Sequence, residues 1–161
     1  MTTDGVLETK DGQQVLRFER RLNHPVERVW VALTEPDELI GWLAAAEVDL
    51  DAGRIVLHWQ NEGGPTMDCK ITQLSAPTLL EYEGEPHGRL RWELRPDGDG
   101  TLLTFTAAGS YPDDQVALAL AGWHWHLGAL AECLSGARVD WPHWPRDEWE
   151  IHYRRYVARL S

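Results

Sequence analysis

Two histidines and a cysteine lie in one apolar segment, "GWHWHLGALAECL" from Gly122 to Leu134, and these residue types commonly bind metals. His124 and His126 are two residues apart, so on a helix their side chains diverge by about 200°. Histidines that chelate one ion from a helix need a spacing of three or four residues. Cys133 follows His126 by seven residues, roughly 10.5 Å along a helix, which is too far for both to bind one ion. The spacing therefore predicts no metal site.

Catalytic signatures are also missing from the sequence. It contains neither the G-x-S-x-G turn of serine hydrolases nor a glycine-rich phosphate-binding motif. Cys133 follows Glu132, whose negative charge disfavours a thiolate, so we expect Cys133 to be a buried apolar residue. The acidic pair Asp113 and Asp114 precedes a helical pattern, where carboxylates favour the helix dipole. We therefore expect no catalytic residue and no cofactor.

The aromatic content is the remaining chemical feature, because the chain has nine tryptophans in 161 residues. Aromatic side chains are favoured in wide cores and around ligands. Two interpretations stay open: the inward-facing side chains fill the core solidly, or they line a pocket for an apolar small molecule. The apolar candidates for that lining are Trp42, Leu57, Trp59, Met67, Cys69, Tyr82, Trp92, Phe105, Trp123, Leu127 and Leu130.

Arg20 is the polar residue that this interior must accommodate. It alternates in phase with Phe18 and Leu22, which places its guanidinium group on the apolar face of a strand. Either Arg20 reaches a ligand in the cavity, or it pairs with an acid such as Glu81 or Glu93. His126 flanks the apolar stripe of its helix and is a second candidate polar group for a ligand.

Length and charge limit the classes of protein that fit. A chain of 161 residues suits a single domain. The net charge of −11 argues against nucleic acid and anionic membranes as partners, because both attract basic proteins. No apolar run reaches the roughly 18 residues of a membrane span, and the N-terminus lacks a signal peptide. We therefore expect a cytoplasmic protein that does not bind membranes.

The elements that position these residues follow from periodicity. Residues 14–22 alternate as a strand, and prolines at 25 and 36 start two short helical segments. A run of short alternating segments then predicts an antiparallel meander with one apolar face. These segments cover residues 54–59, 67–74, 79–83, 89–94 and 101–107.

A long amphipathic helix over residues 113–135 is predicted to cover the apolar face of the meander. A terminal helix over about 147–160 follows a proline-rich turn. Trp125 points away from the core stripe of the long helix, so something must cover it. Either Trp141 and Trp144 fold back onto it, or it lies in a homodimer interface.

Two segments carry a resemblance to a known family. "FERRLNHPVERVWVALTEPDELIGWL" and "AGWHWHLGALAECLSG" resemble the opening strand and helices, and the last long helix, of the START-like or helix-grip (SRPBCC) superfamily. Within it, the chain is similar to the family homologous to the activator of heat-shock protein 90 ATPase. The segment "DLDAGRIVLHWQNEGGP" is shorter and more acidic than the glycine-rich hairpin that relatives often carry.

The resemblance implies an α+β helix-grip fold. Its parts are a curled antiparallel sheet of about six or seven strands on a long C-terminal helix, two short helices after the first strand, and an extra terminal helix. We expect one START-like domain over residues 1–161 with its core at about 14–136. The resemblance further implies non-enzymatic binding of a hydrophobic or aromatic small molecule, lipid- or polyketide-like, between sheet and helix. The alternatives are a stress-related co-chaperone with a chaperone partner and, third, a cyclase-like enzyme.

Overall fold

The structure is a computed structural model that describes residues 3–60 and 64–160. Its strands are β1 (Val6–Lys10), β2 (Gln13–Leu22), β3 (Ala45–Asp49), β4 (Arg54–His58), β5 (Thr66–Ser75), β6 (Leu79–Gly84), β7 (Gly88–Asp97) and β8 (Gly100–Gly109). Its helices are α1 (Val26–Thr34), α2 (Pro36–Leu39), α3 (Asp113–Leu134), the short 3₁₀ helix η2 (Trp141–His143) and α4 (Arg146–Leu160).

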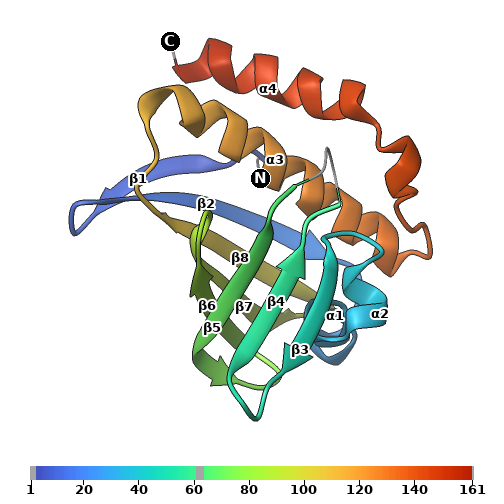
Figure 1. Ribbon diagram of the computed structural model, residues 1–161. Coiled ribbons are helices and arrows are strands. Elements are labelled where there is room, and N and C mark those ends of the chain that lie inside the picture. Colours follow the sequence, from blue (N-terminus) through green and yellow to red (C-terminus); the bar gives the residue numbers. More distant parts are fainter. Residues whose placement is uncertain (1–2, 61–63, 161) are drawn as a thin grey trace.

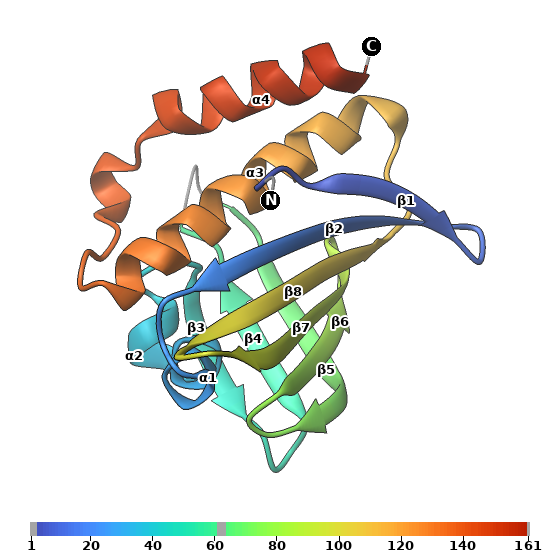
Figure 2. The same cartoon turned by 180° about the vertical axis from the view of Figure 1, so that it is seen from behind.

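The strands form one antiparallel sheet in the order β1-β2-β8-β7-β6-β5-β4-β3. The sheet curls, and α3 lies along it (Figure 1). Seen from behind, α3 lies between the sheet and α4, so the molecule has three layers in the order sheet, α3, α4 (Figure 2). Helices α1 and α2 lie at one end of the sheet, after β2. This is the predicted α+β helix-grip fold with its extra terminal helix.

The sheet has eight strands rather than the six or seven expected, and the two additional strands lie at its edges. β1 pairs with β2 through a hairpin at Asp11 and Gly12, whose φ angles of 52° and 77° suit a tight turn. β3 pairs with β4 at the other edge. Edge strands exposed to solvent need no apolar alternation, so the periodicity that identifies inner strands does not mark them.

The core lies between the inner face of the sheet and α3. Alternate residues of the inner strands point inward, and Phe18, Leu57, Trp92 and Phe105 are all almost fully buried. The ring of Trp123, on α3, lies 4.6 Å from that of Phe105, centroid to centroid. Alternation on the strands and the helical stripe on α3 therefore meet as the sequence predicts.

The tail covers the outer side of α3. The Trp125 ring lies 5.9 Å from Trp141 and 5.6 Å from Trp144, and its indole N–H donates to Glu148. Trp125 is consequently only 7% exposed. Of the two covers expected for Trp125, the structure has the folded-back tail.

Tyr156 of α4 forms hydrogen bonds with two distant parts of the chain, the segment before β1 and α3. Its ring is buried, and its hydroxyl accepts a hydrogen bond from the Gly5 N–H at 2.8 Å. The same hydroxyl lies 2.8 Å from Nδ1 of His124. One phenol oxygen therefore joins α4, α3 and the segment before β1.

None of the helices in the described ranges is long and apolar enough to cross a membrane. The longest, α3, has 22 residues and carries acidic residues in its first turn. Its apolar surface is used for packing between the sheet and α4.

We predict that Tyr156→Phe lowers the free energy of unfolding by about 1–3 kcal/mol, because it leaves the buried Gly5 N–H and His124 Nδ1 without their partner. Urea unfolding followed by circular dichroism measures this change. Tyr153→Phe is the matched control, since the Tyr153 ring stacks on Trp149 while its hydroxyl makes no hydrogen bond within the described ranges. Equal effects of the two substitutions would contradict the role given to the Tyr156 hydroxyl.

Candidate functional site

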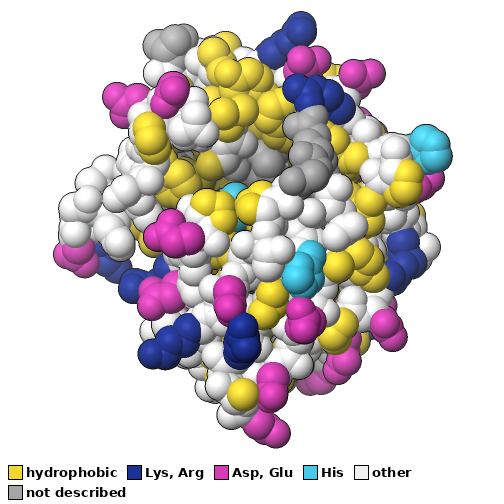
Figure 3. All heavy atoms as spheres, in the orientation of Figure 1, with side chains coloured by type: hydrophobic (Ala, Val, Ile, Leu, Met, Phe, Trp, Pro, Cys, Tyr) yellow, Lys and Arg dark blue, Asp and Glu magenta, His cyan; other side chains and the backbone are white. Residues whose placement is uncertain are grey.

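A pocket opens at one end of the sheet, beside the first half of α3. Its volume is about 470 Å³, and we call it the aromatic pocket. Its lining comes from five places: the end of β4, the residues just before β5, the β6–β7 turn, the link from β8 to α3, and α3. In the space-filling view, hydrophobic side chains surround a hollow in which a histidine is visible (Figure 3). The lining residues are Trp59, Gly64, Pro65, Pro86, His87, Ser110, Tyr111, Pro112, Gln115, Leu118, Ala119, Gly122, Trp123 and His126.

The walls of the aromatic pocket are rings in contact with one another. Trp59 packs edge-on against His87 at 5.0 Å and against Trp123 at 5.9 Å, between ring centroids. His126 lies 5.6 Å from Trp59 and 5.9 Å from Trp123. Edge-to-face packing holds each ring in place and leaves ring surface toward the pocket.

His126 is oriented by a main-chain hydrogen bond. Its Nδ1 lies 3.0 Å from the carbonyl oxygen of Trp42, whose own indole N–H donates to the Ala32 carbonyl. Burial lowers the pKa of His126 to about 4, so the ring is neutral at pH 7. A carbonyl only accepts, so the proton is on Nδ1 and Nε2 carries a lone pair. Within residues 3–60 and 64–160, nothing donates to this Nε2.

Two further polar groups belong to the pocket wall. The indole N–H of Trp59 is buried and has no hydrogen-bond partner in the described part of the chain. The Tyr111 hydroxyl donates to the His87 carbonyl at 3.3 Å, and burial raises its pKa to about 12. The pocket therefore offers an unused donor on Trp59 and an unused acceptor on His126.

The structure brings three of the thirteen predicted site residues to the aromatic pocket: Trp59, Trp123 and His126. Nine others lie in the closely packed core and do not line it. Trp92, for example, packs against Phe105 at 4.2 Å and against Trp42 at 5.6 Å, between ring centroids, which leaves no space between these rings. These nine are Trp42, Leu57, Met67, Cys69, Tyr82, Trp92, Phe105, Leu127 and Leu130. The interior is thus closely packed in one part and borders a pocket in another.

Arg20 lies away from the aromatic pocket. Of the two alternatives for Arg20, the ion pair with Glu81 or Glu93 is wrong, because both acids bind Arg91, at 3.0 Å and 2.6 Å. In the sheet order, β8 and β7 separate β2 from β6, so Arg20 and Glu81 lie far apart. Arg20 instead points to the α3–α4 side and donates to the Thr3 carbonyl at 2.9 Å.

The other residues of the "GWHWHLGALAECL" segment point in different directions. His124 faces α4, where the Tyr156 hydroxyl meets it, whereas His126 faces the Trp42 carbonyl. Cys133 is buried, and burial raises the pKa of its thiol. Among the described residues, no three His, Cys, Asp or Glu side chains form a group that could hold a metal ion.

Sequence reasoning missed His87, Tyr111 and Gly122. The first two lie in connections between elements, where functional residues often concentrate, and "EPHG" and "SYP" are such connections. Gly122 is a glycine inside a helix, where it costs about 1 kcal/mol relative to alanine. A Cβ atom at this position would meet nothing within 4 Å. An unexplained helix glycine is thus the signal that could have located the pocket.

Comparison with known proteins identifies related sequences and folds. The family model described as "Activator of Hsp90 ATPase homolog 1-like protein" matches residues 23–135. No curated protein sequence matches the chain.

Among solved structures, the crystal structure of CalU16 from Micromonospora echinospora is 21% identical, with a TM-score of 0.72 and coverage of 99% of both chains. DynU16, a protein of the dynemicin biosynthetic locus, is 23% identical with a TM-score of 0.66, covering 78% of this chain and 50% of that one. An AHSA1-like protein from Aeromonas hydrophila is 22% identical with a TM-score of 0.62, covering 74% of this chain and 92% of that one. At these identities, the likeness concerns the fold.

We predict that His126 makes stability depend on pH. Its pKa is about 4 in the folded chain and ordinarily 6.5, so below pH 6.5 the unfolded chain binds the proton more readily. The stabilisation is complete above pH 6.5 and is lost as the pH falls towards 4. His126→Asn keeps a donor for the Trp42 carbonyl but removes the titrating group, and with it this pH-dependent part of the stability. The difference in unfolding free energy between wild type and variant therefore narrows by up to about 3 kcal/mol over that range.

Urea unfolding at a series of pH values between 4 and 8 measures this difference. His143→Asn is the control, because the His143 side chain is exposed and bonded only to Asp140 within the described ranges. A gap between wild type and His126→Asn that stays constant with pH would show that His126 is not held neutral by burial.

Proposed function

The chain belongs to the activator of Hsp90 ATPase homolog 1-like family, and from this premise we propose that it binds a hydrophobic or aromatic small molecule in the aromatic pocket without converting it. The helix-grip fold, with a curled sheet and a long helix, is a scaffold for a ligand between these two elements. DynU16, a structural relative, belongs to the dynemicin biosynthetic locus. The small-molecule role proposed for the present chain is argued from its own pocket.

The observation that carries the proposal is the aromatic pocket itself. Its volume of about 470 Å³ is within the roughly 300–1,000 Å³ of small-molecule sites. Trp59, Trp123, Tyr111 and His87 supply aromatic surface on several sides. A flat apolar molecule would cover these rings and displace water from them, which is the main source of affinity in such sites.

The polar groups of the pocket suggest how a ligand would be oriented. Trp59 offers an N–H donor without a partner in the described chain, and His126 offers a lone pair on Nε2. A neutral molecule with one carbonyl and one hydroxyl group would satisfy both. A charged ligand fits less well, because none of the described residues that line the pocket has a charged side chain and His126 stays neutral at pH 7.

The pKa values of His126 and Tyr111 favour binding over catalysis. General acid–base catalysis needs a group whose pKa is near the working pH. The pKa of His126 is about 4 and that of Tyr111 about 12, so neither exchanges a proton readily near pH 7. Both groups suit recognition through fixed hydrogen bonds.

A protein-binding role is the alternative that the family name supports. It predicts that the purified chain raises the ATPase rate of Hsp90. The small-molecule proposal expects no such effect, and a coupled ATPase assay separates the two.

We predict that 2-naphthol, a neutral aromatic probe with one hydroxyl, shifts the NMR signals of the Trp59 and Trp123 indole N–H groups saturably. Gly122→Leu places a side chain in the pocket and lowers the affinity about tenfold or more. The variant also keeps or raises the free energy of unfolding, because leucine favours a helix by about 0.5–1 kcal/mol over glycine.

Gly128→Leu is the matched control. Gly128 is also a glycine of α3 with no atom within 4 Å of a built Cβ, but it does not line the aromatic pocket. The control should bind 2-naphthol as wild type does. The proposal fails if aromatic and lipid-like probes leave the Trp59 and Trp123 signals unchanged, or if Gly122→Leu binds as well as Gly128→Leu.

A further inference from the structure

A second pocket lies on a different side of α3, between α3 and α4, with Arg20 of β2 beside it. We call it the Arg20 pocket; its volume is about 390 Å³. Figures 1 and 2 both show α4 running along the outer side of α3. The lining residues are Arg20, His124, Trp125, Gly128, Ala129, Glu132, Glu148, Ile151 and His152.

Two buried polar atoms of this lining lack a partner in the described part of the chain. Nε of Arg20 and Nδ1 of His152 are buried and form no hydrogen bond with any described residue. Buried polar groups in native proteins almost always have a partner, which can be a bound ligand or ion. Two such atoms at one pocket indicate that something polar belongs there.

The sheet contributes a hydrogen-bond donor to the pocket, the guanidinium group of Arg20. The guanidinium group of Arg20 uses one N–H for the Thr3 carbonyl, and it forms no ion pair with a carboxylate among residues 3–60 and 64–160. Burial lowers the pKa of Arg20, but arginine remains charged at any physiological pH. The pocket therefore contains a fixed positive charge whose Nε–H has no acceptor among the described residues.

His124 adds a further N–H donor. Burial, and then the proximity of His152 and Arg20, lower its pKa to about 3, so the ring is neutral at pH 7. The Tyr156 oxygen accepts from the Gly5 N–H, and we assign its O–H as the donor to Nδ1 of His124. With this assignment the ring proton of His124 is on Nε2. That N–H has no acceptor in the described part of the chain.

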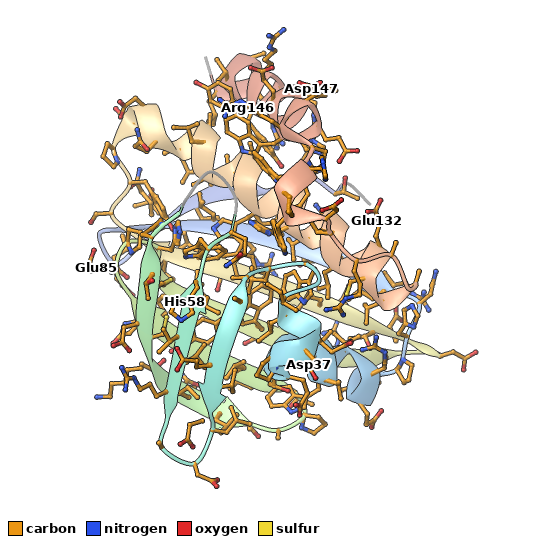
Figure 4. The ribbon with its side chains drawn as sticks, turned by 45° about the vertical axis from the view of Figure 1, so that its right-hand side comes forward. Asp37, His58, Glu85, Glu132, Arg146 and Asp147 are labelled. Carbon is orange, nitrogen blue, oxygen red and sulfur yellow. The ribbon has the colours of Figure 1, made fainter. Side chains whose placement is uncertain are left out.

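The rest of the lining limits the class of anion. Glu132 projects from the last turn of α3 (Figure 4), and Glu148 of α4 accepts from Trp125. These two carboxylates repel a multiply charged anion such as phosphate. Ala129 and Ile151 provide apolar wall. A single carboxylate attached to an apolar group fits this combination, since the arginine fork matches a carboxylate with two parallel hydrogen bonds.

Gly128 keeps this pocket open as Gly122 does the other. A Cβ atom at Gly128 would meet nothing within 4 Å, although glycine costs about 1 kcal/mol relative to alanine inside a helix. The two glycines are six residues apart, about 240° around the helix, so they open pockets on different sides of α3.

We propose that the Arg20 pocket binds the carboxylate group of a small organic monoanion, held by Arg20, His124 and His152, with its apolar part against Ala129 and Ile151. This site is separate from the aromatic pocket and differs from it in ligand class. It does not depend on the function proposed for that pocket.

The test is an NMR titration of the full-length chain with sodium benzoate. The Arg20 Nε–H and the His152 ring signals should shift saturably, whereas benzamide, the neutral molecule of the same shape, and inorganic phosphate should not shift them. Arg20→Gln should weaken benzoate binding about tenfold or more, as expected for loss of a charge-assisted hydrogen-bond pair. Arg17→Gln, on the opposite face of the same strand, should bind benzoate as wild type does.

A second pair of variants leaves every charged group in place. Gly128→Leu fills the Arg20 pocket and should abolish the benzoate shifts, whereas Gly122→Leu should leave them intact. The proposal is overturned if benzoate does not shift the Arg20 and His152 signals, if benzamide or phosphate shifts them as strongly, or if Gly128→Leu still binds benzoate. Failure of 2-naphthol binding with intact benzoate binding would reject only the function proposed for the aromatic pocket.

Discussion

The structure depends on the burial of α3 on two sides. Thirteen of its 22 residues are buried, and they lie all around the helix rather than along one stripe. A helix of this kind is stable only between two layers, because its apolar surface must be removed from water on both sides. The curled sheet covers one side through Trp123 and Phe105, and the tail covers the other through Trp125 and Tyr156. The extra terminal helix is therefore a requirement of α3.

The pockets lie where these two covers end. On the sheet side the aromatic pocket borders Gly122, and on the α4 side the Arg20 pocket borders Gly128. Each pocket also has one histidine of α3 in its lining: His126 at the aromatic pocket and His124 at the Arg20 pocket. Burial keeps both neutral, and one hydrogen bond to Nδ1 orients each, which leaves its Nε2 unpartnered within the described ranges. The different chemistry follows from the partner: the Trp42 carbonyl leaves an acceptor on His126, and the Tyr156 hydroxyl, with its O–H assigned to Nδ1, leaves a donor on His124.

Much of the fold could be predicted from the sequence, whereas only part of the site could. The long helix was expected over 113–135 and is found over Asp113–Leu134, because apolar periodicity marks a packed helix clearly. The edge strands β1 and β3 were missed because exposed strands need no apolar alternation. Of the candidate lining, Trp59 and Trp123 reach the aromatic pocket, while Trp92 and Phe105 pack against one another in the core. Periodicity predicts that a side chain points inward, but it does not predict whether another side chain fills the space beside it.

The sequence by itself determined which side chains face inward, that His124 and His126 diverge, and that Trp125 needs a cover. These are local properties, set by the geometry of a helix or a strand over a few residues. Only the tertiary structure decided that Arg20 faces α4 rather than Glu81, and that His87 and Tyr111 join Trp59 at one pocket. Those residues come from distant parts of the chain. They lie together because of the order of the strands and because the loops leave part of α3 uncovered. A pocket is a place where long-range packing is incomplete, so a helix glycine such as Gly122 can indicate its position, but no short stretch of residues defines its lining.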